Sequence, residues 1–164
     1  MTKQEGSYMI ENKKNRKFPI SFNPQEWERY LKASCYLYAL NIFKDECILV
    51  GDMIGKRCDH EVSDETLIKV LKEELEYIGY KLKEIDKECV ISNSKYKYKI
   101  CLMRDPRTGF YHFLREESDG NWTHKQPGEL PQIFQMNKIN NSDLLQAEPF
   151  RKRWYFEIGG KSYE

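Results

Sequence analysis

Two side chains in this 164-residue sequence have settings that suit nucleophilic chemistry. Cys35 follows Ser34, a good N-cap, so we expect the cysteine in the first turn of a buried helix. There the helix dipole and unpaired backbone N–H groups favour the thiolate, and the same N–H groups can bind the oxyanion of an acyl-transfer intermediate. His112 is expected on a strand about 80 residues later, as the base that would accept the thiol proton.

A third residue should orient the imidazole of His112. The sequence after it offers His124, Asn121, Glu116 and Asp119. A three-residue hairpin loop would place His124 across from Glu116, on the same face as His112, whereas a two-residue loop would place it on the other face. The sequence leaves that register open. His124 is the favoured orienting residue and Asn121 the second choice.

The elements that must position these residues change period along the chain. Apolar residues recur at helical spacing first, and alternation with period two follows after Gly79, which ends the clearest helix. Asp119-Gly120 is a hairpin signal. Helices packed on a mostly antiparallel sheet, an α+β fold, are therefore predicted. The expected helices span 24–31, 33–43 and 64–78, and the expected strands span 80–85, 96–103, 110–116, 122–125 and 151–158.

Two segments carry a resemblance to a known family. The stretch CYLYALN that begins at Cys35 resembles C-Y-x-Y-A-L, and YHFLREESDGNWTHKQPG, from Tyr111 to Gly128, resembles Y-H-F/W-x-R-x-x-S-D-G-x-W-x-H-K-x-G with one extra residue before the glycine. These segments are typical of mostly uncharacterised bacterial and phage proteins that are papain-like (NlpC/CHAP-like) cysteine hydrolases. The resemblance implies a papain-like fold, a Cys35–His112 dyad, and a protein or peptide substrate. The glutamine that papain carries before its nucleophile has no counterpart here, since Arg29 stands near that place.

Composition excludes several other classes. There are 27 Lys and Arg against 26 Asp and Glu, a formal net charge of +1, so no global field attracts nucleic acid or an anionic membrane. No apolar run is long enough to span a membrane, and no secretory signal is visible, so a cytoplasmic location, or delivery into a host cell, is expected. We expect a polar basic arm over 1–17 and one domain over 18–164. Basic clusters near both ends, 13–17 and 151–153, leave room for a local anionic partner.

The five cysteines are odd in number and include no C-x-x-C pair, so neither a disulfide framework nor a zinc ribbon is indicated, and no metal or cofactor is expected. Cys58-x-His60 could be half of a metal site, but a solvated loop is the simpler interpretation. The alternation of Lys and Tyr over 95–99 predicts a strand with tyrosines inward and lysines outward. Small core residues are expected at Cys47, Cys89 and Cys101.

Two functions follow from this sequence. The first is a cysteine hydrolase that cleaves an amide or peptide bond through Cys35, His112 and an orienting residue, with an acyl-enzyme intermediate. The alternative is a non-enzymatic protein-binding module, an inhibitor or interaction domain, on the same scaffold. Nucleic-acid binding is the weakest interpretation.

Overall fold

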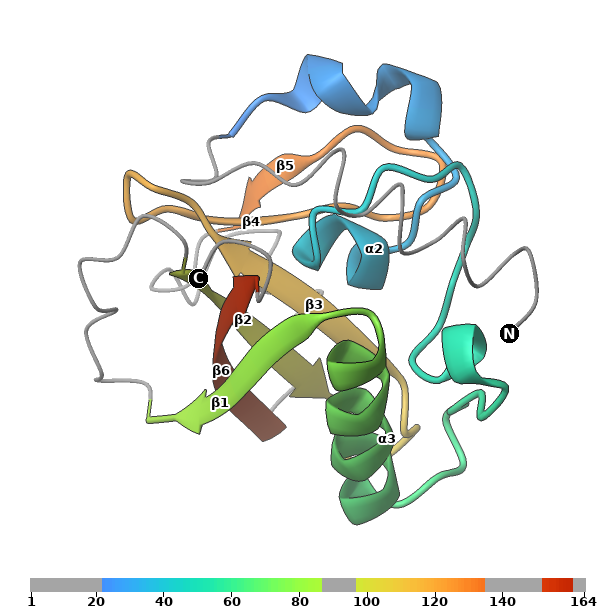
Figure 1. The fold of residues 1–164 in the computed structure, drawn as a ribbon. Coiled ribbons are helices and arrows are strands. Elements are labelled where there is room, and N and C mark those ends of the chain that lie inside the picture. The colour runs from blue at the N-terminus through green and yellow to red at the C-terminus, as the bar shows by residue number, and fades with distance from the viewer. Residues whose placement is uncertain (1–21, 87–96, 135–151, 161–164) are drawn as a thin grey trace.

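A six-stranded antiparallel sheet forms the centre of the molecule (Figure 1). The computed structural model describes residues 22–86, 97–134 and 152–160. The strand order is β1-β6-β2-β3-β4-β5, so the last strand of the chain lies between the first two. The strands are β1 (Tyr80–Ile85), β2 (Lys97–Arg104), β3 (Tyr111–Glu116), β4 (Trp122–His124), β5 (Gln132–Phe134) and β6 (Lys152–Gly160).

Four short or medium helices precede the sheet along the described chain. They are the 3₁₀-helices η1 (Pro24–Tyr30) and η2 (Asp52–Ile54) and the α-helices α2 (Cys35–Ala39) and α3 (Asp64–Tyr77). The Ser63 hydroxyl caps α3 by accepting a hydrogen bond from the N–H of Thr66 at 3.1 Å, as its sequence predicts. The α+β prediction is confirmed. None of the helices in the described ranges has the length and apolar character to cross a membrane.

Helix α2 is shorter than the 33–43 helix expected from the sequence, and the sheet holds it in place. It ends at Ala39, and Asn41 then takes a left-handed conformation with φ of 56°, which an α-helix cannot continue through. A single turn leaves its carbonyls without helical partners, so other groups must satisfy them. The donors come from three strands: Arg115 to the carbonyl of Tyr38 at 2.9 Å, Tyr98 to that of Ala39 at 2.8 Å, and Tyr80 to that of Leu40.

A buried polar network joins α2 to the β3–β4 hairpin. The guanidinium of Arg115 donates to Glu117 Oε1 at 2.9 Å and to the hydroxyl of Tyr38 at 3.1 Å, and it lies 3.9 Å from the centre of the Tyr38 ring. The same Glu117 oxygen accepts a hydrogen bond from Thr123 Oγ1 at 2.6 Å. The Arg115 and Glu117 side chains are 2% and 0% exposed, so this ion pair is shielded from water.

Glu74 is a second buried charged residue that joins separate elements, in this case α3 and the segments before it. Its buried carboxylate accepts hydrogen bonds from the hydroxyl of Tyr36 at 2.5 Å and from the backbone N–H groups of Gly51 and Met53, each at 2.8 Å. Burial raises the pKa of this carboxyl, while these donors lower it. One carboxylate therefore connects α3, α2 and the start of η2.

Both faces of the sheet are apolar. The face that packs on α2 and α3 carries Tyr98, Ile100, Leu102, Phe113, Phe156 and Ile158. The opposite face carries a second buried cluster of Cys101, Met103, Leu114, Phe134 and Tyr155. Alternation along β3 places Phe113 in the first cluster and Leu114 in the second. This division decides on which side of β3 each candidate site residue lies.

Three expectations need correction. Strand β5 was not predicted, because three residues after Pro131 give too little alternation. Cys47 is exposed rather than a core residue, whereas Cys101 is buried as predicted. Tyr98 points inward as expected, but Lys99 is also buried, on the second face, where its Nζ lies 3.8 Å from Glu116 Oε2. Cys89, the arm over 1–17 and Arg151 lie outside the described residues.

We expect replacement of Arg115 by methionine to destabilise the fold by about 3–5 kcal/mol, because it leaves the carboxylate of Glu117 buried without its cation. Urea unfolding followed by circular dichroism measures this loss. The double variant R115M/E117Q, which removes both charges, should recover much of it. A loss below about 1 kcal/mol for R115M would show that the network contributes little to stability.

Candidate functional site

The predicted nucleophile, Cys35, begins α2. Ser34 caps that helix, since its hydroxyl accepts a hydrogen bond from the N–H of Leu37 at 3.3 Å and donates to the carbonyl of Ile48 at 2.6 Å. This N-cap agrees with the sequence prediction. The thiol of Cys35 is half-buried and packs beside the core that α2 shares with the sheet. A reagent or substrate can therefore reach it from only part of its surroundings.

Burial, rather than the helix start, determines the charge of Cys35. Desolvation raises the pKa of its thiol to about 11, although the backbone N–H of Phe113 and those of Tyr36 and Cys35 itself act in the opposite direction. Cys47 adds a smaller upward contribution. The expected thiolate is therefore not the resting form: the structure places a neutral thiol at the start of α2.

His112 and His124 meet across the β3–β4 hairpin. His112 Nε2 lies 3.0 Å from His124 Nδ1, and the two rings are perpendicular. Glu116 pairs with Trp122 rather than with His124, so the expected pairing of His124 with Glu116 is wrong. Continuing the register from Arg115 opposite Thr123 puts His124 across from Leu114, which still places it on the same face as His112. The edge of the His124 ring packs on Phe134 of β5, with 5.1 Å between ring centres. The structure thus brings together the predicted base and the favoured orienting residue.

The tautomer of this contact decides what His112 can do. If His112 Nε2–H donates to His124 Nδ1, the lone pair of His112 lies on its other nitrogen, Nδ1, which is then the basic atom. Burial, with a smaller contribution from His124, lowers the pKa of His112 to about 3. His112 is therefore a neutral imidazole at neutral pH, which is the form a general base needs.

Cys35 approaches His112 through the backbone of β3. The N–H of Phe113, the residue directly after His112, lies near enough to the sulfur to affect its pKa. The structure shows no direct hydrogen bond between the Cys35 thiol and the His112 ring, both of which lie in the described part of the chain. Alternation sends the Phe113 ring toward Tyr36 of α2 and His112 to the other side of the strand. Cys35 and the His112 ring therefore lie on opposite sides of β3, and the dyad is not closed.

The other candidates for the orienting role lie elsewhere. Asn121 bonds Asp119 within the exposed hairpin turn, its side-chain amide donating to Asp119 Oδ2 at 3.2 Å. Glu116 is engaged with Lys99. Gly120, between Asp119 and Asn121, has a φ of 88°, as the Asp-Gly turn signal predicts. Only His124, of the four candidates, contacts His112 within the described residues.

The possible half metal site, Cys58 and His60, does not gather further ligands. Cys58 is buried and its thiol contacts the carbonyl of Lys56 at 3.6 Å, while the His60 ring stacks on Phe110 with 5.1 Å between centres. Within residues 22–86, 97–134 and 152–160, no group of three or more His, Cys, Asp or Glu is placed to hold a metal ion. Of the C-terminal basic cluster, Lys152 pairs with Asp64 at 2.7 Å.

Sequence reasoning missed Lys125 as part of the site. Its ammonium is buried directly after His124 and donates to the carbonyls of Leu31 at 2.6 Å and Ala33 at 2.7 Å, just before Cys35 in the chain. The only signal was its place next to His124 in the distal segment, where lysine reads as a surface residue.

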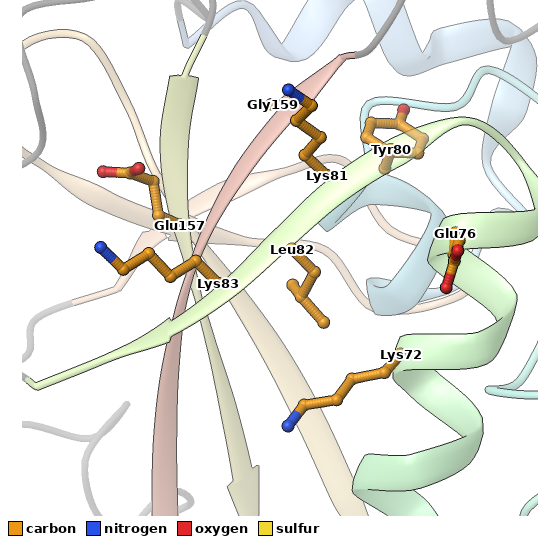
Figure 2. Close-up of a pocket in the computed structure, with 8 residues that line it drawn as sticks. All are labelled: Lys72, Glu76, Tyr80, Lys81, Leu82, Lys83, Glu157 and Gly159. Atoms are coloured by element: carbon orange, nitrogen blue, oxygen red, sulfur yellow. The ribbon is translucent and has the colours of Figure 1, made fainter.

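A separate hollow lies away from Cys35, where α3 meets the edge of the sheet (Figure 2). Its volume is about 530 Å³, and its lining includes Lys72 of α3 and Lys81 and Lys83 of β1, together with Glu76 and Glu157. Figure 2 shows the Lys83 and Glu157 side chains near each other on the neighbouring strands β1 and β6. Charged side chains of both signs therefore line this hollow together with Tyr80 and Leu82.

Comparison with known proteins gives no relative for this chain: no protein-family model, curated protein or solved structure matches it. The interpretation of the site therefore depends on its geometry.

We expect Cys35 to react with iodoacetamide more slowly than Cys47 at pH 7, because the buried thiol has a pKa of about 11 and the thiolate is the nucleophile. Its alkylation rate should rise steadily up to about pH 10. Peptide mass spectrometry at a series of pH values measures both cysteines in one sample. Faster alkylation of Cys35 than of exposed Cys47 at pH 7 would contradict a neutral resting thiol.

We expect stability to fall as pH decreases from about 6.5 toward 3, because His112 binds its proton in the unfolded chain well before it does so in the fold. Its contribution is on the order of 1 kcal/mol per pH unit, somewhat less than for a fully buried group. Urea unfolding at several pH values should give a shallower decline for His112→Asn. His60→Asn is the matched control, since the His60 side chain is 47% exposed, and its curve should follow the unmodified protein. Identical slopes for all three proteins would show that His112 is not held neutral by the fold.

Proposed function

We propose that this protein is a cysteine hydrolase that cleaves an amide or peptide bond, with Cys35 as nucleophile, His112 as base and His124 as the residue that orients it. The observation that carries the proposal is the 3.0 Å contact between His112 Nε2 and His124 Nδ1, next to the strand amide that faces the Cys35 sulfur. In a catalytic triad the orienting group holds one ring nitrogen of the base, and the contact between His112 and His124 supports that half of the arrangement. It also supports a papain-like (NlpC/CHAP-like) assignment of the fold.

The neutral resting pair defines the first step. His112 Nδ1 takes the proton from Cys35 Sγ as the sulfur attacks the substrate carbonyl, so a thiolate need not accumulate beforehand. The backbone N–H of Cys35 is a donor for the oxyanion that forms. His112 then gives its proton to the leaving nitrogen, the C–N bond breaks, and a thioester remains on Cys35. Water attacks the thioester with His112 again as base, and the proton returns to the sulfur as the carboxylic acid leaves.

Closure of the dyad accompanies substrate binding in this proposal. Catalytic hydrogen bonds are commonly long or poorly aligned in free enzymes and shorten in the complex with substrate. Here Cys35 packs on the α2 side of the sheet, near the N–H of Phe113, whereas alternation places the His112 ring on the other side of β3. The mechanism therefore requires the His112 imidazole to reach the Cys35 side of β3, which is a larger rearrangement than a change in one side-chain torsion.

A non-enzymatic binding role is the second candidate, and the hollow between α3 and β1 favours it. That hollow has about 530 Å³ and three lysines in its lining, and no predicted catalytic residue takes part in it. A partner bound there would depend on Lys81 and Lys83 rather than on Cys35. The two functions are therefore separable by substitution.

The decisive test is hydrolysis of a library of fluorogenic peptide amides by the purified protein. We expect turnover for the unmodified chain and for the control Cys47→Ser, and a loss of at least about 1,000-fold for Cys35→Ser and about 100-fold or more for His112→Asn. His124→Asn should reduce kcat about tenfold to 100-fold, since it removes orientation rather than the base. Mass spectrometry should detect an acyl adduct on Cys35.

Activity that survives Cys35→Ser would contradict the hydrolase proposal. So would an absence of turnover across the library together with full biological effect of the Cys35→Ser variant. That second result would favour the binding role, which Lys81→Glu and Lys83→Glu would then impair.

A further inference from the structure

Lys125 is a buried ammonium with an unusual set of partners. Lys125 is 1% exposed, and its Nζ donates to the carbonyls of Leu31 at 2.6 Å, Ala33 at 2.7 Å and Gln126 at 3.3 Å. Three donors meet three acceptors, so the hydrogen-bonding capacity of the group is used completely. Within the described part of the chain, no carboxylate lies within salt-bridge distance of Nζ. The positive charge is solvated by carbonyls but not cancelled.

The carbonyls that Lys125 binds belong to the segment that leads into the nucleophile. Ala33 is separated from Cys35 only by the capping residue, and Leu31 follows the end of η1. The N–H of Gly128, from the loop after β4, donates to the same carbonyl of Leu31. This segment is therefore held by the chain that directly follows His124.

Lys125 and Cys35 also interact through charge, although Lys125 is not among the main influences on the pKa of the Cys35 thiol. Desolvation lowers the pKa of this ammonium, and nearby acidic groups, Asp45 first and then Cys35, Cys47 and Glu129, act in the opposite direction. The ammonium and the Cys35 thiol thus lie within electrostatic range of each other in a poorly screened region. His112 is neutral, so it adds no positive charge in the resting state. Tyr111, another titratable group near Cys35 besides Cys47, is also neutral because burial raises its pKa.

We propose that Lys125 is a positioning residue for Cys35: its buried ammonium both anchors the backbone before the nucleophile to the strand that carries His124 and supplies the positive charge that stabilises negative charge on the sulfur. This role rests on the proposed function for its biological meaning. It deepens that proposal by giving the site a positive charge. During attack, this charge would stabilise the negative sulfur that burial disfavours. Lys125 touches neither the sulfur nor the imidazole through a hydrogen bond, so it acts through the Ala33–Cys35 backbone and through its field.

The test measures the pH dependence of Cys35 alkylation by iodoacetamide in folded variants, by peptide mass spectrometry. Lys125→Met keeps much of the apolar stem and removes the ammonium. We expect its profile to move to higher pH by one unit or more, which is about a tenfold slower alkylation at a given pH. Lys125→Arg retains the charge and should keep the original profile. Lys99→Met is the matched control, because Lys99 is also a buried lysine but pairs with Glu116 on the second face of the sheet.

A folded Lys125→Met protein with an unchanged profile would overturn the proposal, and so would a change of equal size in Lys99→Met. If Lys125→Met does not fold, the Lys125→Arg variant provides the test. A folded arginine variant whose alkylation profile moves to higher pH by one unit would show that a cation at this place does not act on the sulfur. Alkylation requires no substrate, so these outcomes are independent of hydrolysis. If the hydrolysis assay with Cys35→Ser contradicts the hydrolase proposal, the alkylation result for Lys125 is unaffected. If the alkylation profile contradicts the role of Lys125, the hydrolysis result is likewise unaffected.

Discussion

The fold depends on side-chain donors that satisfy the carbonyls of α2, a helix of five residues. One helical turn cannot satisfy its own backbone, and nucleation of so short a helix is unfavourable in isolation. In this protein the sheet supplies the missing partners. Arg115, Tyr98 and Tyr80 serve the end of the helix, and Lys125 serves the residues before it. Tertiary contacts therefore determine this helix. Its start, where Cys35 lies, is held by the residue that directly follows β4.

The same construction explains the electrostatics of the candidate site. A helix that is held by buried donors must itself be buried, so the thiol at its first position loses hydration. A one-turn helix has a small dipole, which cannot offset that loss, and the pKa of Cys35 rises to about 11. His112 responds to the same environment in the opposite direction, because burial opposes its protonation. Both groups are neutral, so chemistry at this site depends on proton transfer during attack rather than on a preformed ion pair.

Most of the fold could be predicted from the sequence, because its local signals agree with its tertiary structure. The Ser63 cap and the apolar face of α3 defined that helix, and strand β1 has the predicted bounds over 80–85. The contact of His112 with His124 followed from placing both on one face of a hairpin, although the sequence left the register open. By contrast, the long helix expected over 33–43 was wrong, because Asn41 adopts a left-handed conformation. The apolar residues before Asn41 have helical spacing, so the sequence pattern gave no sign of this helix end.

The charged interior was beyond sequence reasoning. Arg115, Glu117, Lys125 and Lys99 all occur in strands or turns where alternation assigns charged residues to solvent. Each is buried because a partner from a distant part of the chain replaces its hydration, as when Tyr38 and Arg115, 77 positions apart, meet through a carbonyl. No local pattern contains that information. The same limit applied to Cys35, where the helix start was predicted correctly but the expected thiolate is replaced by a thiol whose pKa desolvation raises.

The two segments that carry the family resemblance contain two kinds of residue. Some are needed to hold α2 against the β3–β4 hairpin, and others take no part in that contact. Tyr38 in the first segment, and Arg115, Glu117 and Thr123 in the second, are explained by the network that joins α2 to the hairpin. A resemblance through these residues alone would indicate a shared way of docking a short helix, with no chemistry implied. Cys35, His112 and His124 take no part in that network. The contact between His112 and His124 lies on the second face of the sheet, where His124 packs on Phe134, and it does not support α2. The chemical interpretation of the protein therefore depends on these three residues, and on Lys125, which connects them to the architecture.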